Sequence, residues 1–203
     1  MAEIKGFGWN ALTFSFFATV VFAILGAWGQ KDQMKCIWSE KSGKSVAVNS
    51  FSVIFALFVS FVIYGIQKSS LALIIGGALR VPFLFGILLG LWRFKGFTLR
   101  ERGVVVALAL GLLYMPFSSY RGVIFLIFTY LGVAATLLQA WEIWEKKSRG
   151  VVSIKMLVVY NTSVMFWVIY GLALDDKKVF VMGLSYVIAY TLTIILWLVY
   201  RNE

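Results

Sequence analysis

Arg80 is the residue of this sequence that is hardest to account for by helix packing alone, because it is charged and lies deep within the apolar stretch 70–92. In lipid, a charge at that depth costs at least about 2–3 kcal/mol unless it faces protein or water. A planar guanidinium binds carboxylates and phosphates well. We therefore predict that Arg80 contacts an anionic group of a ligand. The alternative is a structural arginine that pairs with helix-end carbonyls or with an acid.

Polar residues in or beside other apolar stretches are further candidates. Asn161 is the most polar residue in the middle of the stretch 151–173, where it either contacts a ligand or ties two helices together for about 0.6–2 kcal/mol. Tyr186 adds a hydroxyl group within the stretch 179–200. Asp32 lies at the end of the first apolar stretch, where it exchanges a proton, pairs with Arg80 in one state, or is simply solvated.

The residue types also exclude several kinds of chemistry. The sequence has no His and a single cysteine, Cys36, so a cysteine zinc cluster and an intrachain disulfide are impossible. It shows no acid pair and no nucleophile–base set. We therefore predict no enzyme activity, no metal site and no cofactor. The net charge of +10 is divided among short segments between apolar runs, which indicates membrane topology and not nucleic-acid binding.

Membrane helices are the elements that must position these residues. Apolar residues make up 61% of the chain and charged residues only 14%, which excludes an ordinary soluble domain. Unbroken apolarity without strand-like alternation predicts helices in a lipid bilayer. The sequence contains seven stretches of about bilayer length, of which the fourth is the shortest. They are 8–33, 46–66, 70–92, 103–117, 120–141, 151–173 and 179–200.

Basic residues predict the orientation of these helices. They gather after the first, third, fifth and seventh stretches, at Lys31, Lys35, Lys41, Lys44, Arg93, Lys95, Arg100, Arg102, Lys146, Lys147, Arg149, Lys155 and Arg201. Because cytoplasmic loops carry an excess of Lys and Arg, this side is predicted to be cytoplasmic. We expect a multi-pass protein of the plasma (inner) membrane, with the N-terminus outside and the C-terminus cytoplasmic. Whether it forms a homo-oligomer stays open.

An internal repeat organises the chain. Residues 33–65 align without a gap with residues 139–171, at an offset of 106, and eleven of the thirty-three positions are identical. About two or three identities are expected from shared apolar composition alone. The identical pairs run from Gln33 and Gln139 to Gly65 and Gly171. A repeat of this kind decides the architecture and has to be settled before single helices are interpreted.

Two copies separated by one helix define the predicted fold class. Three helices begin and end on opposite faces of the membrane, so a second copy in the same direction needs one inverting helix before it. We predict an all-α membrane protein with seven transmembrane helices: a triple-helix bundle at 1–95, a linker helix at 96–118 and a second, parallel bundle at 119–203. Transporters with such repeats bind their solute at the repeat interface near the membrane midplane.

The repeated pattern resembles the PQ-loop and SWEET family of transporters. In each copy a Gln is followed after four residues by Trp, then by Lys-Ser and by a Val-led helix that ends in Tyr-Gly. The second copy, at 138–148 and 167–171, is the closer match, and the resemblance covers both copies. It implies a passive facilitator that moves a small polar solute by alternating access, with sugar as the family's usual substrate.

The resemblance also implies where the solute is bound. In sugar-transporting relatives the solute lies between an aromatic residue late in the second helix of each copy and an Asn sixteen residues further on. Here the Asn positions hold Gly77 and Gly183. Glycine has no side-chain donor or acceptor, which weakens the sugar assignment and favours a larger or anionic solute bound through Arg80 as the alternative. The predicted solute-binding residues are Phe61, Trp167, Gly77, Gly183, Arg80, Asn161 and Tyr186.

The gate implied by the resemblance is altered as well. The family's gating Gln is present in both copies, but the helix-bending Pro before it is not. Since such a Pro lets a helix bend, movement would have to rely on glycines in the first helix of each copy. The predicted gate and hinge residues are Asp32, Gln33, Leu138, Gln139, Gly26 and Gly132.

Two other classes of function stay open at this point. A non-transporting receptor of the PQ-loop type would be expected to present several buried basic residues, whereas only Arg80 is predicted to lie inside the membrane. A structural or sensory membrane subunit is the other class, and no feature of the sequence excludes it. The partners we expect are the lipid bilayer and a small polar solute.

Overall fold

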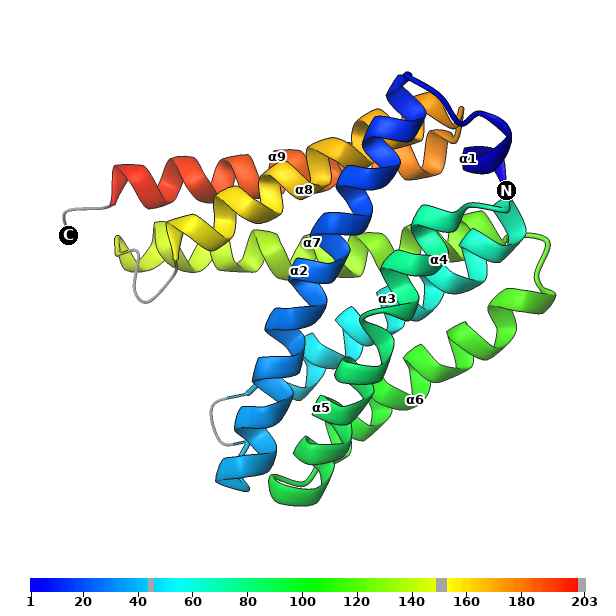
Figure 1. Cartoon of the computed structure of the whole chain (residues 1–203). Coiled ribbons are helices and arrows are strands. Elements are labelled where there is room, and N and C mark those ends of the chain that lie inside the picture. The colour runs from blue at the N-terminus through cyan, green and yellow to red at the C-terminus, as the bar shows by residue number, and fades with distance from the viewer. Residues whose placement is uncertain (44–45, 149–152, 201–203) are drawn as a thin grey trace. The chain divides into compact units, whose positions relative to one another are not determined.

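The computed structural model describes residues 1–43, 46–148 and 153–200, and every element within these ranges is a helix (Figure 1). In chain order the elements are α1 (Ala2–Lys5), α2 (Ala11–Glu40), α3 (Val48–Lys68), α4 (Leu71–Ala78), α5 (Val81–Phe94), α6 (Leu99–Tyr114), the 3-10 helix η1 (Met115–Phe117), α7 (Arg121–Lys146), α8 (Ile154–Ala173) and α9 (Lys177–Val199).

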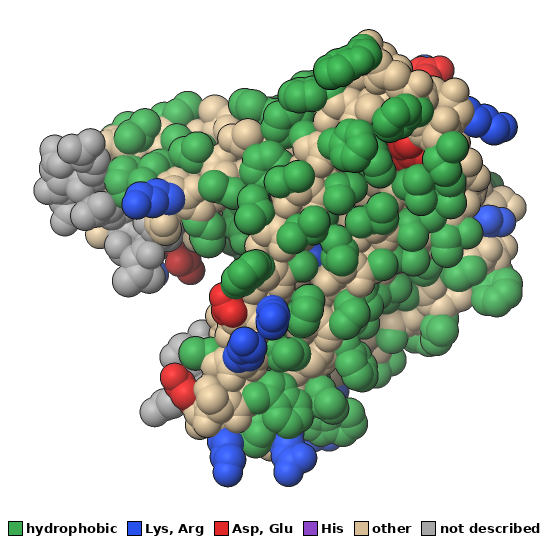
Figure 2. All heavy atoms as spheres, viewed as in Figure 1, with side chains coloured by type: hydrophobic (Ala, Val, Ile, Leu, Met, Phe, Trp, Pro, Cys, Tyr) green, Lys and Arg blue, Asp and Glu red, His purple; other side chains and the backbone are tan. Residues whose placement is uncertain are grey.

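Six helical segments of the described chain are long and apolar enough to cross a membrane. They are Ala11–Glu40, Val48–Lys68, Leu71–Phe94, Arg121–Lys146, Ile154–Ala173 and Lys177–Val199. Hydrophobic side chains cover most of the face shown in Figure 2, as expected for a protein that contacts lipid. The prediction of an all-helical, multi-pass membrane protein is confirmed. The fourth predicted stretch corresponds to α6, which at 1.5 Å per residue is only about 24 Å long, and η1 continues it to Phe117.

Helices α2 and α7 extend further than the apolar stretches that predicted them. They end at Glu40 and Lys146, whereas the stretches ended at 33 and 141. Hydropathy shows where a helix leaves the lipid, but backbone hydrogen bonds continue beyond that point. The basic residues expected in connections therefore lie partly within helices, namely Lys31, Lys35, Arg93, Arg100, Arg102, Lys146 and Lys155. Lys44, Arg149 and Arg201 lie outside the described residues.

The stretch 70–92, predicted as a single helix, is interrupted. α4 ends at Ala78 and α5 begins at Val81, with Leu79 and Arg80 between them. Pro82 is the physical reason, because it has no N–H to donate to the Ala78 carbonyl and its ring clashes with a straight helix. In the second copy Ile188 stands at this position, and α9 is continuous (Figure 1).

The backbone repeats at the same offset as the sequence, which confirms the internal repeat. The ends of α2 and α7, the starts of α3 and α8, and the starts of α4 and α9 all lie 106 residues apart. Non-glycine residues with positive φ also form pairs at this offset: Lys41 (φ 47°) with Lys147 (φ 50°), and Ser69 (φ 51°) with Asp175 (φ 54°). A positive φ is uncommon for residues with a Cβ, so both copies use the same strained turns.

The chain divides into two compact units. One comprises Met1–Lys5 and Val20–Phe128, and the other comprises Gly6–Thr19 and Thr129–Glu203. In the first unit, α3 contacts α4, α5 and α6, and a cluster of buried residues forms between α2, α3 and α5. Its members are Ile37, Val48, Leu84, Ile87 and Leu91. In the second unit, α8 and α9 lie side by side.

The start of α6 is fixed by a capping box. The Thr98 hydroxyl accepts from the Glu101 backbone N–H, and the Thr98 backbone N–H and hydroxyl donate to the Glu101 carboxylate. These hydrogen bonds, the backbone one first, hold the pKa of Glu101 below its usual value. The helix that is predicted to join the two copies therefore has a defined beginning outside its apolar stretch.

Candidate functional site

Gly77 and Gly183 lie where the second and third spanning segments of each copy cross. A Cβ at Gly77 would lie 2.5 Å from the carbonyl oxygen of Phe58, and a Cβ at Gly183 would lie 2.8 Å from the backbone nitrogen of Val168. Both atoms belong to a neighbouring helix backbone, so no side chain fits at either glycine. Close helix packing explains these glycines without a solute, and their contact with a solute stays a prediction.

Arg80 lies at the break between α4 and α5 and connects three elements of the first unit. Its Nη2 donates to the carbonyl oxygen of Phe22 in α2 at 3.1 Å, and its Cζ lies 4.5 Å from the ring centroid of Phe58 in α3. The guanidinium also occupies the space beside Gly26, where a Cβ would overlap it. These contacts stabilise the charge within the first unit. The accepting carbonyl lies in the middle of α2, and not at a helix end as the structural alternative predicted.

Phe61 and Trp167 occupy equivalent places in α3 and α8, and both are buried, with 4% and 7% of their surface exposed. The ring of Phe61 lies 5.6 Å from that of Phe125, and Trp167 makes an edge contact with Tyr170 at 5.6 Å. Each ring therefore packs within its own unit. Their contact with a solute stays a prediction.

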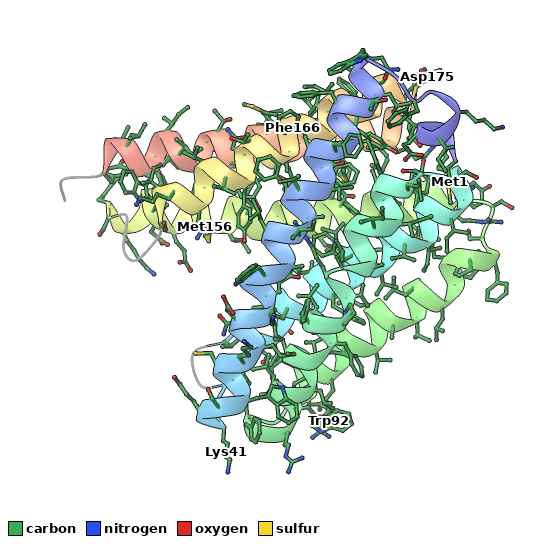
Figure 3. All side chains as sticks on the ribbon, viewed as in Figure 1. Met1, Lys41, Trp92, Met156, Phe166 and Asp175 are labelled. Carbon is green, nitrogen blue, oxygen red and sulfur yellow. The ribbon has the colours of Figure 1, made fainter. Side chains whose placement is uncertain are left out.

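The second unit gathers polar side chains between α8 and α9. Asn161 lies on α8 between Met156 and Phe166, which Figure 3 labels, and its Nδ2 donates to Oγ1 of Thr191 at 3.3 Å. The rings of Tyr186 and Tyr190 stack at 6.0 Å. The ring of Tyr160, next to Asn161, lies 5.9 Å from that of Tyr190. The structure thus brings the predicted residues Asn161 and Tyr186 to one region of the second unit.

The equivalent positions of the first unit are apolar. Phe55 and Phe85 stand in place of Asn161 and Thr191, with ring centroids 6.3 Å apart. The interpretation of the sequence did not identify Thr191. An alignment of α9 with α5 at the offset of 106 would have identified Thr191, because it replaces an aromatic residue opposite Asn161.

The predicted gate and hinge positions lie within uninterrupted helices. Asp32 and Leu138 are exposed, and Gln33 and Gln139 are half-buried. α2 and α7 continue through their glycines without a break. At Gly132 the carbonyl oxygen accepts from the Thr136 hydroxyl at 3.2 Å. Gating by these residues, including Gly26, stays a prediction.

The comparisons with known proteins agree with the resemblance. Residues 119–203 match the family model described as "Sugar efflux transporter for intercellular exchange". The whole fold is similar to that of a eukaryotic SWEET transporter, with a TM-score of 0.77 over 95% of this chain and 98% of that chain, at 13% sequence identity. Residues 119–203 are a SWEET-family repeat, and the chain has the SWEET fold. No curated protein sequence matches it.

The predicted resemblance is thereby confirmed, in sequence for residues 119–203 and in fold for the chain. The SWEET family is a family of membrane transporters and not a class of enzymes. The part that matches the family model is the second copy, which also matches the quoted pattern more closely. Within the described residues, no group of three His, Cys, Asp or Glu residues is placed to hold a metal ion.

In this SWEET-type chain a buried carboxylate stands at the start of the third span in each copy. Asp176 is the N-cap of α9 and accepts from the Val179 backbone N–H at 3.3 Å. The equivalent residue before α4 is Ser70, and the carboxylate comes from Glu3 of α1, whose Oε1 accepts from the Ala72 backbone N–H at 3.2 Å. Figure 3 shows Met1 beside the start of α4. A negative charge is favourable there because of the helix dipole.

Removing this carboxylate tests its contribution to the first unit. A Glu3→Ala variant is expected to lose about 1–2 kcal/mol of stability, because the buried start of α4 loses an acceptor. Glu3→Gln keeps an acceptor oxygen and should lose less. Thermal unfolding of the purified SWEET-type protein in detergent measures both, with the exposed Glu145→Ala as a matched control that stays within about 0.5 kcal/mol. Equal losses in Glu3→Ala and Glu145→Ala would contradict the assignment.

Proposed function

We propose that this SWEET-type chain is a passive carrier that moves a small, neutral polar solute, with sugar as the first class to test, by alternating access. The observation that carries the proposal is the match of residues 119–203 to the sugar efflux family. The repeat of helix boundaries at 106 residues supports two parallel triple-helix bundles at 1–95 and 119–203. α6 and η1 then serve as the inverting linker within 96–118.

The contacts of Arg80 favour a neutral solute over an anion. Its guanidinium already donates to the Phe22 carbonyl and lies over the Phe58 ring. An anionic solute at this arginine would have to displace these contacts. The second unit instead offers uncharged polar groups, on Asn161, Tyr186 and Thr191, which suit hydroxyl groups. Recognition by Arg80 remains the alternative.

The proposed orientation places the N-terminus outside and the C-terminus in the cytoplasm of the plasma membrane. Its support is that basic residues of neighbouring segments gather at one end within each unit. In the first unit, Lys95 Nζ donates to the Val46 carbonyl at 2.8 Å, and Figure 3 shows Lys41 and Trp92 at the same end. In the second unit, Lys147 Nζ donates to the Tyr200 hydroxyl at 2.9 Å. We assign both ends to the cytoplasmic side on the excess of Lys and Arg there.

Counterflow into liposomes tests the proposed function. Purified protein is reconstituted into vesicles loaded with unlabelled glucose, sucrose, an amino acid or an organic acid, and uptake of the labelled solute is followed without any ion gradient. We expect counterflow of a sugar at least about tenfold above protein-free vesicles, because exchange by a carrier is stimulated by solute on the far side. Organic acids should not be exchanged.

The alternatives give different results in the same assay. A receptor or a structural subunit exchanges none of these solutes. A carrier of anions exchanges the organic acid and not the sugars. Uptake that requires a proton gradient would contradict the passive mechanism while leaving the transporter class intact.

A further inference from the structure

The side-chain amide of Asn161 is held at one end only. Its Nδ2 donates to Thr191 Oγ1 at 3.3 Å, whereas Oδ1 is buried and has no hydrogen-bond partner among the described residues. A buried acceptor without a donor is destabilising, and native proteins rarely leave one without a water or ligand to satisfy it. This oxygen therefore marks a place where a donor binds.

Comparison of the two copies shows that helix packing does not require this polar pair. At the equivalent places of the first copy, Phe55 and Phe85 hold α3 and α5 together through ring contact, with centroids 6.3 Å apart. The same crossing can thus be built from apolar side chains, which involve no desolvation of polar groups. The polar pair in the second copy needs another explanation.

Thr191 holds one end of this amide. Its hydroxyl oxygen accepts from the amide NH2 group, which leaves the carbonyl oxygen of Asn161 as the end that is open to a donor. Without that acceptor the amide could turn, and an NH2 group could take the place of the oxygen. In the observed pairing, residue 191 therefore holds the amide with its acceptor oxygen at the open point.

We propose that Thr191 is a positioning residue for solute recognition, which holds Asn161 so that Oδ1 accepts a hydrogen bond from a hydroxyl group of the transported solute. The inference rests on the proposed function and deepens it, because it assigns one polar contact to the second copy alone. A solute that lacks the donor at this point loses the contact, and a carboxylate there is repelled by the carbonyl oxygen.

The test uses counterflow of D-glucose and each of its monodeoxy analogues by the full-length protein in liposomes. Thr191→Val is expected to raise KM for glucose about 3- to 10-fold, as for one lost hydrogen bond, with the maximal rate within twofold of wild type. It should leave KM unchanged for the one analogue that lacks the bound hydroxyl. Thr191→Ser keeps the hydroxyl and should restore the wild-type KM for glucose.

A matched control lies two residues further along α9. Thr193 is buried, and its hydroxyl donates to the Ala189 carbonyl of its own helix at 2.8 Å, so Thr193→Val makes the same change without touching Asn161. It should leave the ratio of KM values between glucose and the analogues unchanged. Thermal unfolding of each variant shows whether folding is affected.

Three results would overturn the inference. Thr191→Val could change KM for glucose and for every deoxy analogue alike, which would show that the hydrogen bond only ties α8 to α9. It could leave all KM values unchanged. Finally, a wild-type protein that exchanges none of these sugars would overturn the proposed sugar transport itself, and with it the inference.

Discussion

Gly183→Ala is expected to destabilise the second unit by about 2–3 kcal/mol or more, and Gly77→Ala should do the same to the first unit. In both cases the added Cβ would meet backbone atoms of the neighbouring helix, at 2.8 Å from the Val168 nitrogen and 2.5 Å from the Phe58 oxygen. Backbone cannot move aside by changing a rotamer. The two helices must separate, and packing along the whole crossing is weakened.

Gly29 provides the matched control for this prediction. It lies within α2, and a Cβ there would meet no atom within 4 Å. Gly29→Ala should therefore be neutral, or stabilising by up to about 1 kcal/mol, because alanine favours a helix over glycine. Thermal unfolding in detergent measures all three variants. A Gly183→Ala variant as stable as Gly29→Ala would show that the helix crossing is not as close as described.

A Gly183→Asn variant separates packing from solute binding. The resemblance implied that Asn belongs at this position and contacts the solute, whereas the structure leaves no room for its side chain. We expect the variant to unfold at lower temperature and to lose counterflow. If it is stable and exchanges sugar faster than wild type, Gly183 faces the solute and the crossing explanation is wrong.

Most of the helical architecture could be predicted from the sequence, because length and apolarity define spans and the repeat defines which spans correspond. The break in the third span was missed for a local reason. Pro82 was visible in the sequence, but its neighbours are as apolar as the rest of the stretch, and hydropathy is insensitive to one missing N–H. The ends of α2 and α7 were missed because a helix continues into water after its apolar stretch ends.

The site was predictable only in part. Asn161 and Arg80 stand out because each is polar within an apolar stretch, and that signal is local. Their partners are not local: Arg80 bonds to Phe22 and Asn161 to Thr191. The Phe22 carbonyl leaves no mark on the sequence pattern, and Thr191 stands out only when the two copies are aligned. Glu3 was missed because its partner, Ala72, is likewise not local.

Arg80→Ala is expected to cost the first unit about 2–3 kcal/mol. The variant loses a charge-assisted hydrogen bond to the Phe22 carbonyl, worth about 1.5–3 kcal/mol, and the contact with the Phe58 ring, worth about 0.5–2 kcal/mol. The gain from no longer desolvating a charge offsets part of this loss. The void beside Gly26 adds to it, because glycine has no side chain to fill the space.

A double-mutant cycle with Gly26 tests whether the arginine acts through this packing. Gly26→Ala alone should displace the guanidinium that its Cβ overlaps, whereas in the Arg80→Ala background the same Cβ has room. We expect a coupling of at least about 1 kcal/mol between the two substitutions in thermal unfolding.

Counterflow of sugars by Arg80→Ala should fall only with the folded fraction, with unchanged preference among solutes. If Arg80→Ala unfolds like the wild type but loses exchange of an organic acid alone, Arg80 is a ligand for anions, because the loss of a structural contact would also lower the stability.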